Sequence, residues 1–414
     1  MKCDFLILGS GLAGYAAAIT AQSSGKRPVI LSRGPGGTSL ASGAWSFGHL
    51  KEGESFDDFW RSARRQELFA RVLAPEIEKA QTVREATQRV AAALGPQFMT
   101  FSWDRPMNLP TTSGRWRLAY GAQTIQARAD QALLKGRRVG LVGSKSWRFP
   151  FEDLARQLSA KGGLEVLPFE IDWPKEGTDW PLPRLFMTLE HGTGAGEKFL
   201  AAITQKVEKT LVDFLLLPPL VPESLRAKLE TSLKLPFGEC LATTEPCAGF
   251  RLTNALSQSL KERDILHLIS HSIQPKVEGK RITAVSTGTG DTAITLLPDN
   301  VVLATGKIFG GGIELGFQSL QETLFHLPVF GGSNDSPLHA RAELDWTPNK
   351  FSSAQPWAKI GVWVNEEWSP RDETGTVVLS NLRACGSIIG GVDWAHAGIG
   401  LGYSALSGAQ SVAP

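Results

Sequence analysis

The chain has 414 residues, of which 42% are hydrophobic, and its 43 basic and 41 acidic side chains leave a formal net charge of +2. This length supplies two or three domains with full hydrophobic cores, and the balance of charge excludes a strong field that would attract nucleic acid or an anionic bilayer. Four scattered cysteines exclude a disulfide scaffold or an iron–sulfur cluster, and seven histidines without ligand spacing lead us to expect no metal site.

The amino-terminal region predicts a strand, a glycine turn and a helix. Residues 4–8 form a mainly apolar run, residues 9–14 read GSGLAG, and a second apolar run stands at 28–31. In a dinucleotide-binding βαβ unit, Gly9 permits the turn, Gly11 lets backbone N–H groups approach a phosphate, and Gly14 lets helix and strand pack closely. We therefore predict that a flavin or nicotinamide nucleotide binds with its phosphate at the helix N-terminus. The interrupted apolar stretch argues against a secretion signal, so we expect a cytoplasmic protein.

The end of the second predicted strand departs from the usual nucleotide-binding pattern. An acidic residue commonly stands there and accepts hydrogen bonds from the ribose hydroxyls of adenosine, whereas this chain has Ser32 and Arg33. FMN, FAD held in a modified way, and an NADP-type 2′-phosphate on Arg33 are therefore all open interpretations. A solvated surface charge is the alternative interpretation of Arg33.

A loop, helices and an extended segment follow. Residues 34–43 are rich in glycine and predict a loop that wraps the cofactor, and residues 56–93 show the apolar spacing of scaffold helices. From 98 to 120 the sequence predicts extended structure that lines a pocket, with the polar side chains Arg105, Thr111, Thr112, Arg115 and Arg117.

A second alternation of strands and helices begins at residues 138–143. A helix is predicted at 152–161, strands at 164–169 and 212–217, and a further helix after Pro222, which together indicate a separate parallel-sheet domain. The glycine at 143 lacks the companions of a second nucleotide turn, so we interpret it as structural. Residues 211–221 are apolar but contain Asp213 and two prolines, which indicates a buried strand and turn rather than a membrane span.

The last third of the chain predicts a return to the first domain. A helix opens near Gly249, strands are expected at 265–269 and 282–285, and residues 300–306 predict a buried strand that ends in ATG. Glycine-rich turns at 386–402 precede a closing helix. We therefore expect an α/β fold with a discontinuous Rossmann-like flavin-binding domain (1–97 and 245–414) and an inserted second α/β domain (98–244) that contacts substrate or a partner.

With these signatures placed, the chain resembles the family of anaerobic glycerol-3-phosphate dehydrogenase B subunits. The matching segments are Ser32-Arg33-Gly34, Ser42-Gly43, Gly249–Leu252, Phe309–Gly312, Gln355-Pro356-Trp357 and Gly386-Ser387 through Asp393. The resemblance implies an FMN cofactor, with FAD as the alternative, an FAD-containing A subunit, and an iron–sulfur C subunit that docks the complex at the inner membrane. The predicted cofactor-binding residues are Gly9, Gly11, Gly14, Ser32, Arg33, Ser42, Gly43, Thr305, Gly306, Gly386, Ser387, Gly398, Gly400 and Gly402.

Candidate catalytic and substrate-binding residues adjoin these segments. Where the family has a glycine-dense run, this chain has His396, which could act as general base toward an alcohol or form a hydrogen-bonding wall of the pocket. Arg117, Arg251 and Lys307 are candidates for binding a substrate phosphate, although each is also a candidate solvated or structural charge.

The resemblance implies the function of a flavin-dependent subunit in the oxidation of sn-glycerol 3-phosphate to dihydroxyacetone phosphate, with electrons passed through partner subunits to quinone. Whether this subunit transfers the hydride or relays electrons is left open by the sequence. One alternative is a self-sufficient FAD- or NAD(P)-linked oxidoreductase acting on another small hydroxy compound or amine. Another is a flavin-free assembly subunit that keeps the glycine turns only as architecture.

Overall fold

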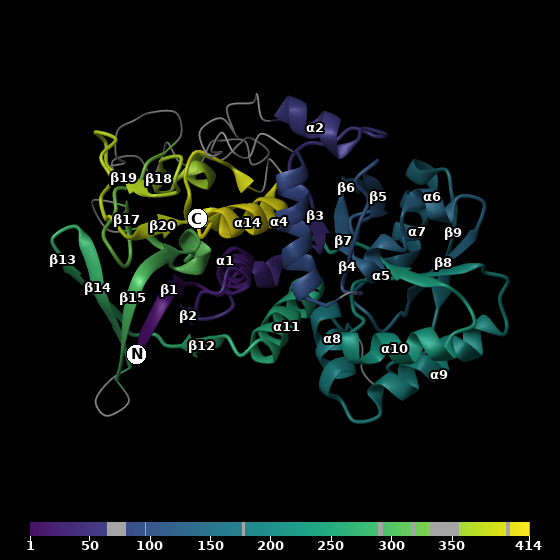
Figure 1. The fold of residues 1–414 in the computed structure, drawn as a ribbon. Helices are drawn as coiled ribbons and strands as arrows, with labels where there is room; N and C mark the ends of the chain where they lie inside the picture. Colours follow the sequence, from purple (N-terminus) through teal and green to yellow (C-terminus); the bar gives the residue numbers. More distant parts are fainter. Residues whose placement is uncertain are drawn as a thin grey trace.

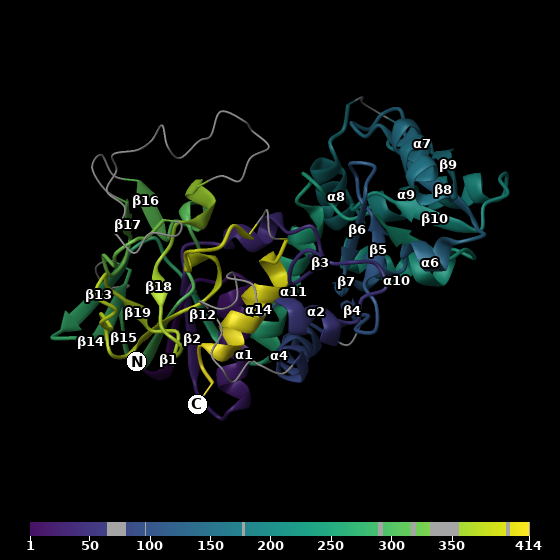
Figure 2. The same ribbon diagram turned by 90° about the horizontal axis from the view of Figure 1, so that it is seen from above.

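The computed structural model describes residues 1–63, 80–95, 97–175, 179–288, 293–315, 320–331, 356–394 and 398–413. Figures 1 and 2 show two bodies, one built from both ends of the chain and one, coloured blue to teal, built from its middle. The two chain termini therefore belong to the same body. No helix among the described ranges is both long and apolar enough to cross a membrane.

The body that holds both termini is organised around a seven-stranded sheet in the order β12-β2-β1-β15-β14-β13, with β20 paired to β15 outside this path. Strands β12, β2, β1, β15 and β20 pair in parallel, and β14 and β13 are added antiparallel. The strand bounds are β1 Lys2–Leu8, β2 Pro28–Ser32, β12 Leu266–Ile269, β13 Ile273–Glu278, β14 Arg281–Thr287, β15 Ile294–Leu303 and β20 Leu382–Ala384.

Helices and short ribbons surround this sheet. The α-helices are α1 Leu12–Ser23, α2 Phe56–Ala63, α4 Ala80–Ala93, α11 Cys247–Glu262 and α14 Gly400–Gln410. The 3₁₀ turns are η1 Gly36–Leu40, η4 Ile308–Gly310, η5 Pro356–Lys359 and η6 Gly386–Ile388. The ribbons are β16 Ile313–Leu315 with β17 Leu320–Glu322, and β18 Trp363–Val364 with β19 Pro370–Arg371.

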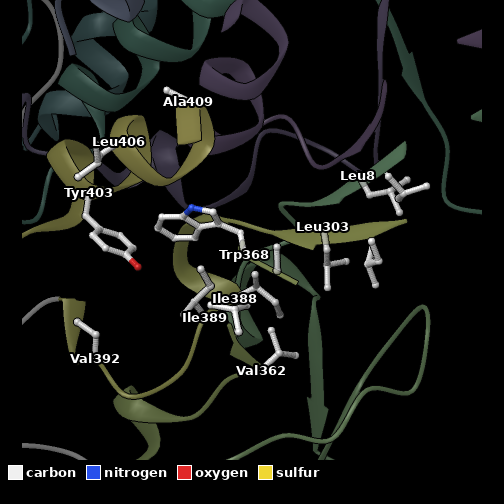
Figure 3. Close-up of a cluster of buried hydrophobic side chains, with 14 of the residues drawn as sticks. Leu8, Leu303, Val362, Trp368, Ile388, Ile389, Val392, Tyr403, Leu406 and Ala409 are labelled. Carbon is white, nitrogen blue, oxygen red and sulfur yellow. The ribbon is translucent and has the colours of Figure 1, made fainter. Parts of the chain in front are cut away.

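Small residues bring the first and last helices together. A Cβ atom on Gly408 of α14 would lie 2.1 Å from the carbonyl oxygen of Ala13 in α1, so only glycine permits this approach. On the neighbouring strands, Leu8 is in register with Leu303, and both belong to a buried cluster that Tyr403 and Leu406 enter from α14 (Figure 3). Burial of such side chains stabilises the fold by roughly 25 cal/mol per Å² of apolar surface. This packing fixes the carboxyl-terminal helix over the amino-terminal βαβ unit.

The second body has a four-stranded, all-parallel sheet in the order β11-β10-β8-β9. Its strands are β8 Arg138–Gly143, β9 Glu165–Glu170, β10 Phe214–Leu217 and β11 Phe237–Glu239. Its helices are α5 Thr124–Ala127, α6 Gln131–Leu134, α7 Phe151–Gly162, α8 Leu182–His191, α9 Ala195–Val207 and α10 Glu223–Ser232. A Cβ on Gly143 would lie 2.1 Å from the Phe151 ring, which gives this glycine a packing role.

A small sheet and a hairpin stand between the two bodies. The sheet has the order β3-β7-β4, and the hairpin pairs β5 with β6. Their bounds are β3 Ala44–Trp45, β4 Met99–Phe101, β5 Met107–Pro110, β6 Trp116–Ala119 and β7 Gly121–Gln123. The extended structure predicted for 98–120 is thus present, and its hairpin contacts α6 and α7 of the second body.

The predicted α/β fold, a discontinuous nucleotide-binding domain with an inserted second α/β domain, is confirmed. Several element boundaries differ from expectation. Strand β15 spans Ile294–Leu303 rather than 300–306, so the ATG residues follow the strand, and β10 begins at Phe214 rather than 212. Helix α11 begins at Cys247 rather than near Gly249, and α14 begins at Gly400, inside the glycine-rich segment expected to precede it. Part of the helical prediction for 56–93, residues 64–79, lies outside the described residues. The domain boundaries at 97/98 and 244/245 stay a prediction.

Candidate functional site

A cavity of about 1190 Å³ lies at the carboxyl ends of β1, β2 and β15. Ligands of open α/β sheets bind at this edge. Residues from the beginning, the middle and the end of the chain line the same cavity, and among them are Gly9, Ser10, Gly11, Ser32, Arg33, Thr38, Ser42, Arg115, Trp116, Arg117, Thr305, Gly306, Ile308, Phe309, Gly311, Gly386, Ser387, Trp394, Gly398 and Gly400. One ligand can therefore touch both the amino-terminal turn and the carboxyl-terminal glycine turns.

The amino-terminal turn has the geometry of a phosphate cradle. Gly9 has a φ of +122°, and a Cβ there would lie 2.3 Å from the Ala304 carbonyl oxygen. A Cβ on Gly14 would lie 2.0 Å from the Gly9 carbonyl oxygen, so both glycines are needed for the turn itself. Helix α1 has no acidic residue in its first turn, and its N-terminal N–H groups can attract an anion. Gly9, Gly11 and Gly14 place no side chain in the turn, and the side chain found next to it is that of Thr38.

Thr38, from the glycine-rich loop, caps this cradle. The Leu12 N–H donates a hydrogen bond to Thr38 Oγ1 over 2.9 Å, and the same hydroxyl oxygen lies 3.2 Å from where a Cβ on Gly11 would sit. A hydroxyl oxygen at a helix N-terminus occupies the kind of position that a phosphate oxygen takes. The predicted loop at 34–43 therefore does reach the expected phosphate site.

The end of β2 forms one side of the cavity. Ser32 is buried, and its hydroxyl lies 2.9 Å from Nε2 of His267 in the neighbouring strand β12. Burial lowers the pKa of His267. Arg33 follows at the surface and lines the cavity. The structure thus has a hydroxyl–imidazole pair and an arginine where a ribose-binding carboxylate commonly stands.

The opposite wall comes from the end of β15 and from η6. Gly306 and Gly386 both have a φ of +73°, and a Cβ on Gly306 would lie 3.4 Å from Ser387 Oγ. The Gly386 N–H donates to Ser407 Oγ of α14 over 3.0 Å, which fixes the turn against the closing helix. The ATG segment and the Gly386-Ser387 turn therefore meet, as the sequence signatures predicted.

The hairpin of β5 and β6 supplies cations from the inserted part. Arg115 and Arg117 line the cavity, and Arg117 Nη2 lies 3.7 Å from the position of a Cβ on Gly398, next to the start of α14. Burial lowers the pKa of Arg117. Among the described lining residues, three are arginines and none is lysine, aspartate or glutamate. An arginine-lined cavity without carboxylates favours ligands that carry negative charge.

The structure brings together most of the predicted cofactor-binding residues. Gly14, Gly43 and Gly402 do not line the cavity: a Cβ on Gly43 would collide with Gln126, and one on Gly402 would lie 2.5 Å from the Ser46 carbonyl oxygen. These three glycines shape the surrounding backbone. The predicted residues that do line it are Gly9, Gly11, Ser32, Arg33, Ser42, Thr305, Gly306, Gly386, Ser387, Gly398, Gly400 and, for substrate, Arg117.

Two of the predicted substrate-binding cations lie elsewhere. Arg251 is buried and donates four hydrogen bonds, to Glu239, Gln123 and the Val221 carbonyl oxygen, so its guanidinium is engaged with protein groups. Lys307 Nζ donates to the carbonyl oxygens of Ala358 and Val392, and neither Arg251 nor Lys307 lines the cavity. Desolvation lowers the pKa of Lys307 to about 7. Both side chains hold chain segments together instead of facing a ligand.

Other predictions concern histidine, cysteine and metal. His396, the predicted catalytic residue, lies outside the described residues. All four cysteines are free and buried, and burial raises the pKa of Cys385 to about 12, so none is a reactive thiolate. No cluster of metal ligands occurs within the part of the chain that the structure describes.

Sequence reasoning missed several residues at the site. No motif in the sequence indicated His267, which contacts Ser32 although the two residues are 235 positions apart in the chain. No motif indicated the exposed apolar side chains at the rim of the cavity either, which are Leu40, Ile308 and Phe309. Thr38 could have been found, because a threonine at the end of a glycine run after the second strand is suited to cap the α1 turn.

Comparison with known proteins supports the flavin-binding signatures. The family model "FAD binding domain" matches residues 4–158 and 136–402. Proteins named as the B subunit of anaerobic glycerol-3-phosphate dehydrogenase are similar along 98% of this chain: 23% identical in Glaesserella parasuis, and 24% in both Pasteurella multocida and Haemophilus influenzae, with 97–98% of each relative covered. The resemblance predicted from the sequence is thereby confirmed.

Solved structures are more distant. The 3-ketosteroid-Δ4-(5α)-dehydrogenase of Rhodococcus jostii has 11% identity and a TM-score of 0.37 over 99% of this chain and 95% of its own. Sdh1 of Mycobacterium smegmatis has 10% identity and a TM-score of 0.39 over 100% of this chain and 69% of its own.

The cavity and the family match agree on the ligand. A Cβ on Gly9 or Gly14 would collide with backbone atoms, so the turn at the N-terminus of α1 requires both glycines, and the family model spans both parts of the chain that form the cavity. The predicted flavin cofactor is therefore confirmed; the family description names FAD, the predicted alternative, and FMN stays a prediction. The chain belongs to the FAD-binding domain family of flavoproteins.

Proposed function

We propose that this protein is a flavin-carrying subunit of a complex that oxidises sn-glycerol 3-phosphate to dihydroxyacetone phosphate and passes the electrons to a quinone. The names of the full-length relatives support the reaction and the subunit role. The single observation that carries the proposal is the cavity lined by three arginines and no carboxylate among its described residues, because both a flavin phosphate and a phosphorylated polyol need cationic partners.

The flavin would lie along the glycine turns. The backbone N–H group of Gly11 and the Thr38 hydroxyl, which accepts from the Leu12 N–H and can still donate its own proton, are suited to hold its phosphate. Thr305, Gly306, Gly386 and Ser387 are suited to contact the ring end. A bound flavin supplies an acceptor for two electrons and a proton from the substrate carbinol.

Arg117 and Arg115 are the proposed cations for the substrate phosphate. They come from the hairpin of β5 and β6, whereas the phosphate cradle comes from the start of α1, and both line the cavity. Because Arg117 has no carboxylate partner among the described residues, its charge is available to an anionic ligand. Binding of the substrate phosphate by Arg115 and Arg117 would hold the carbinol carbon of the substrate toward the ring end of the flavin. His396, between the lining residues Trp394 and Gly398, stays the proposed base for the hydroxyl proton.

Partner subunits are proposed from the relatives' names and from the rim of the cavity. Leu40, Ile308 and Phe309 are 65%, 41% and 80% exposed at this rim, and exposed apolar side chains beside a site favour contact with another protein. The proposed partners are a flavoprotein of the A type and an iron–sulfur subunit of the C type, through which the complex would associate with the inner membrane.

The test is a comparison of Arg117→Ala with Arg148→Ala, an exposed arginine of the second body that is paired with Asp179. Glycerol 3-phosphate is titrated calorimetrically into flavin-loaded protein, alone and assembled with its partner subunits. Loss of the Arg117–phosphate interaction is expected to weaken binding about 10- to 100-fold without loss of flavin, and Arg148→Ala is expected to bind as wild type. An unchanged affinity of Arg117→Ala for glycerol 3-phosphate would refute the role of Arg117 in substrate binding. A colourless protein that binds no added flavin would refute the whole proposal.

A further inference from the structure

The turn after β2 lies next to the phosphate cradle. The Gly9 N–H donates to the Leu31 carbonyl oxygen over 2.9 Å, and Ser10 Oγ donates to the Gly34 carbonyl oxygen over 2.9 Å. These bonds fasten the start of α1 to the segment that carries Ser32 and Arg33. The Arg33 side chain, which has a long flexible stem, therefore starts within reach of an anion at the helix N-terminus.

Ser32 does not offer what an adenosine ribose needs. Its hydroxyl is engaged with His267 Nε2, and burial of the imidazole favours its neutral form. A carboxylate would present two charged acceptor oxygens to the ribose diol, whereas this pair presents one neutral hydroxyl. The anchor that commonly holds the adenosine half of a dinucleotide is missing here.

Arg33 offers hydrogen-bond donors where the ribose-binding carboxylate commonly offers acceptors. Its Nη1 lies 3.7 Å from where a Cβ on Gly311 would sit, so the side chain reaches from the end of β2 toward the η4 turn on the other wall. Within the described ranges Arg33 has no ion pair and no hydrogen bond, and no carboxylate lines the cavity. A guanidinium has five N–H donors and no acceptor, which suits phosphate oxygens and not a ribose diol.

We propose that Arg33 is the residue that determines which flavin this cavity prefers, with His267 as a positioning residue that acts through Ser32. Arg33 pairs with the terminal phosphate monoester of a flavin mononucleotide, which carries about −1.5 to −2 charge at neutral pH. An adenosine extension would bring ribose hydroxyls to a place that holds a guanidinium and a neutral hydroxyl instead of a carboxylate. The inference rests on the proposed function solely in requiring a flavin in the cavity.

The experiment measures binding of FMN and of FAD separately. The full-length protein is freed of flavin, and each flavin is titrated while its fluorescence is followed, for wild type, Arg33→Ala, Arg33→Glu and His267→Gln. Arg27→Ala and His271→Gln are the matched controls: Arg27 is an exposed arginine that precedes β2, and His271 is an exposed histidine that follows β12. Arg33 is itself exposed, so its substitution is not expected to impair folding.

Wild type is expected to bind FMN more tightly than FAD. Arg33→Ala is expected to weaken FMN binding about tenfold, because a charge-assisted bond is lost at a solvent-screened site, and to change FAD binding less than threefold. Arg33→Glu is expected to reverse the preference, since its carboxylate repels the monoester and accepts from the ribose diol. His267→Gln is expected to reduce the ratio of FMN affinity to FAD affinity. If His267 had a purely structural role, both affinities would change together and this ratio would stay the same.

Two results would overturn the inference while leaving the proposed function intact. One is a wild type that prefers FAD, and the other is an Arg33→Ala variant in which both affinities fall equally or neither changes. Failure of the wild type to bind either flavin would instead refute the proposed function itself, and the inference with it.

Discussion

Replacement of Arg251 by alanine is expected to destabilise the protein without affecting its ligand sites directly. The guanidinium donates to Glu239 Oε1 and Oε2 over 3.1 and 2.6 Å, to Gln123 Oε1 over 2.8 Å and to the Val221 carbonyl oxygen over 2.6 Å. Glu239 is 0% exposed, so removal of Arg251 leaves a buried carboxylate that retains only the N–H groups of Leu220 and Val221. Breaking a buried pair in this way costs about 3–5 kcal/mol.

The loss of stability in Arg251→Ala should depend on pH, and the titration of Glu239 decides whether the loss grows or shrinks as pH falls. Burial raises the pKa of this carboxyl, and Arg251 is the largest influence that lowers it. A raised folded-state pKa means that the folded protein favours the protonated acid, so the variant should gain stability as pH falls through that pKa toward the unfolded value. The difference in free energy of unfolding between variant and wild type is therefore expected to be smaller at pH 5 than at pH 8.

The assay is urea denaturation followed by far-ultraviolet circular dichroism and tryptophan fluorescence. Arg148→Ala, which removes an exposed ion pair with Asp179, is the charge-matched control and should leave the unfolding midpoint unchanged. The double variant Glu239→Gln/Arg251→Met should recover much of the loss, because no buried charge is left without a partner. A loss below about 1 kcal/mol, or weaker flavin or substrate binding at unchanged stability, would refute the structural role of Arg251.

Three further predictions concern the cavity and its surroundings. Gly14→Ala should lose bound flavin, because its Cβ would lie 2.0 Å from the Gly9 carbonyl oxygen. Gly196→Ala in α9, where a Cβ meets only the end of the Leu225 side chain at 3.0 Å, should keep it, and equal flavin content in both variants would contradict the cradle geometry. Desolvation lowers the pKa of Lys307 to about 7 in the folded protein, so the unfolded chain binds more protons between about pH 7 and about pH 10.5. The free energy of unfolding should therefore rise with pH over this range more steeply in wild type than in Lys307→Met. Equal slopes in the two proteins would contradict the lowered pKa. His396→Gln should reduce turnover of the assembled complex without reducing flavin content measured by absorbance, and an unaltered turnover would exclude the general-base role.

Local sequence pattern was enough to predict the elements that carry the cofactor signatures. The strand and GSGLAG turn at residues 4–14, the second alternation from residue 138 and a buried strand before the ATG segment are all predicted, because strand and helix periodicities and glycine turns are properties of short segments. The same local signatures carried the resemblance to flavoproteins that the family match confirmed.

Which side chains face the ligand depends instead on how distant segments pack. Arg117 and Arg251 were equal candidates in the sequence, yet Arg117 lines the cavity from a hairpin while Arg251 is bound to Glu239. The pairing of Ser32 with His267 joins residues far apart in the chain. Such choices are set by which strands become neighbours in a sheet and which helices pack over them, and no short window of sequence holds that information.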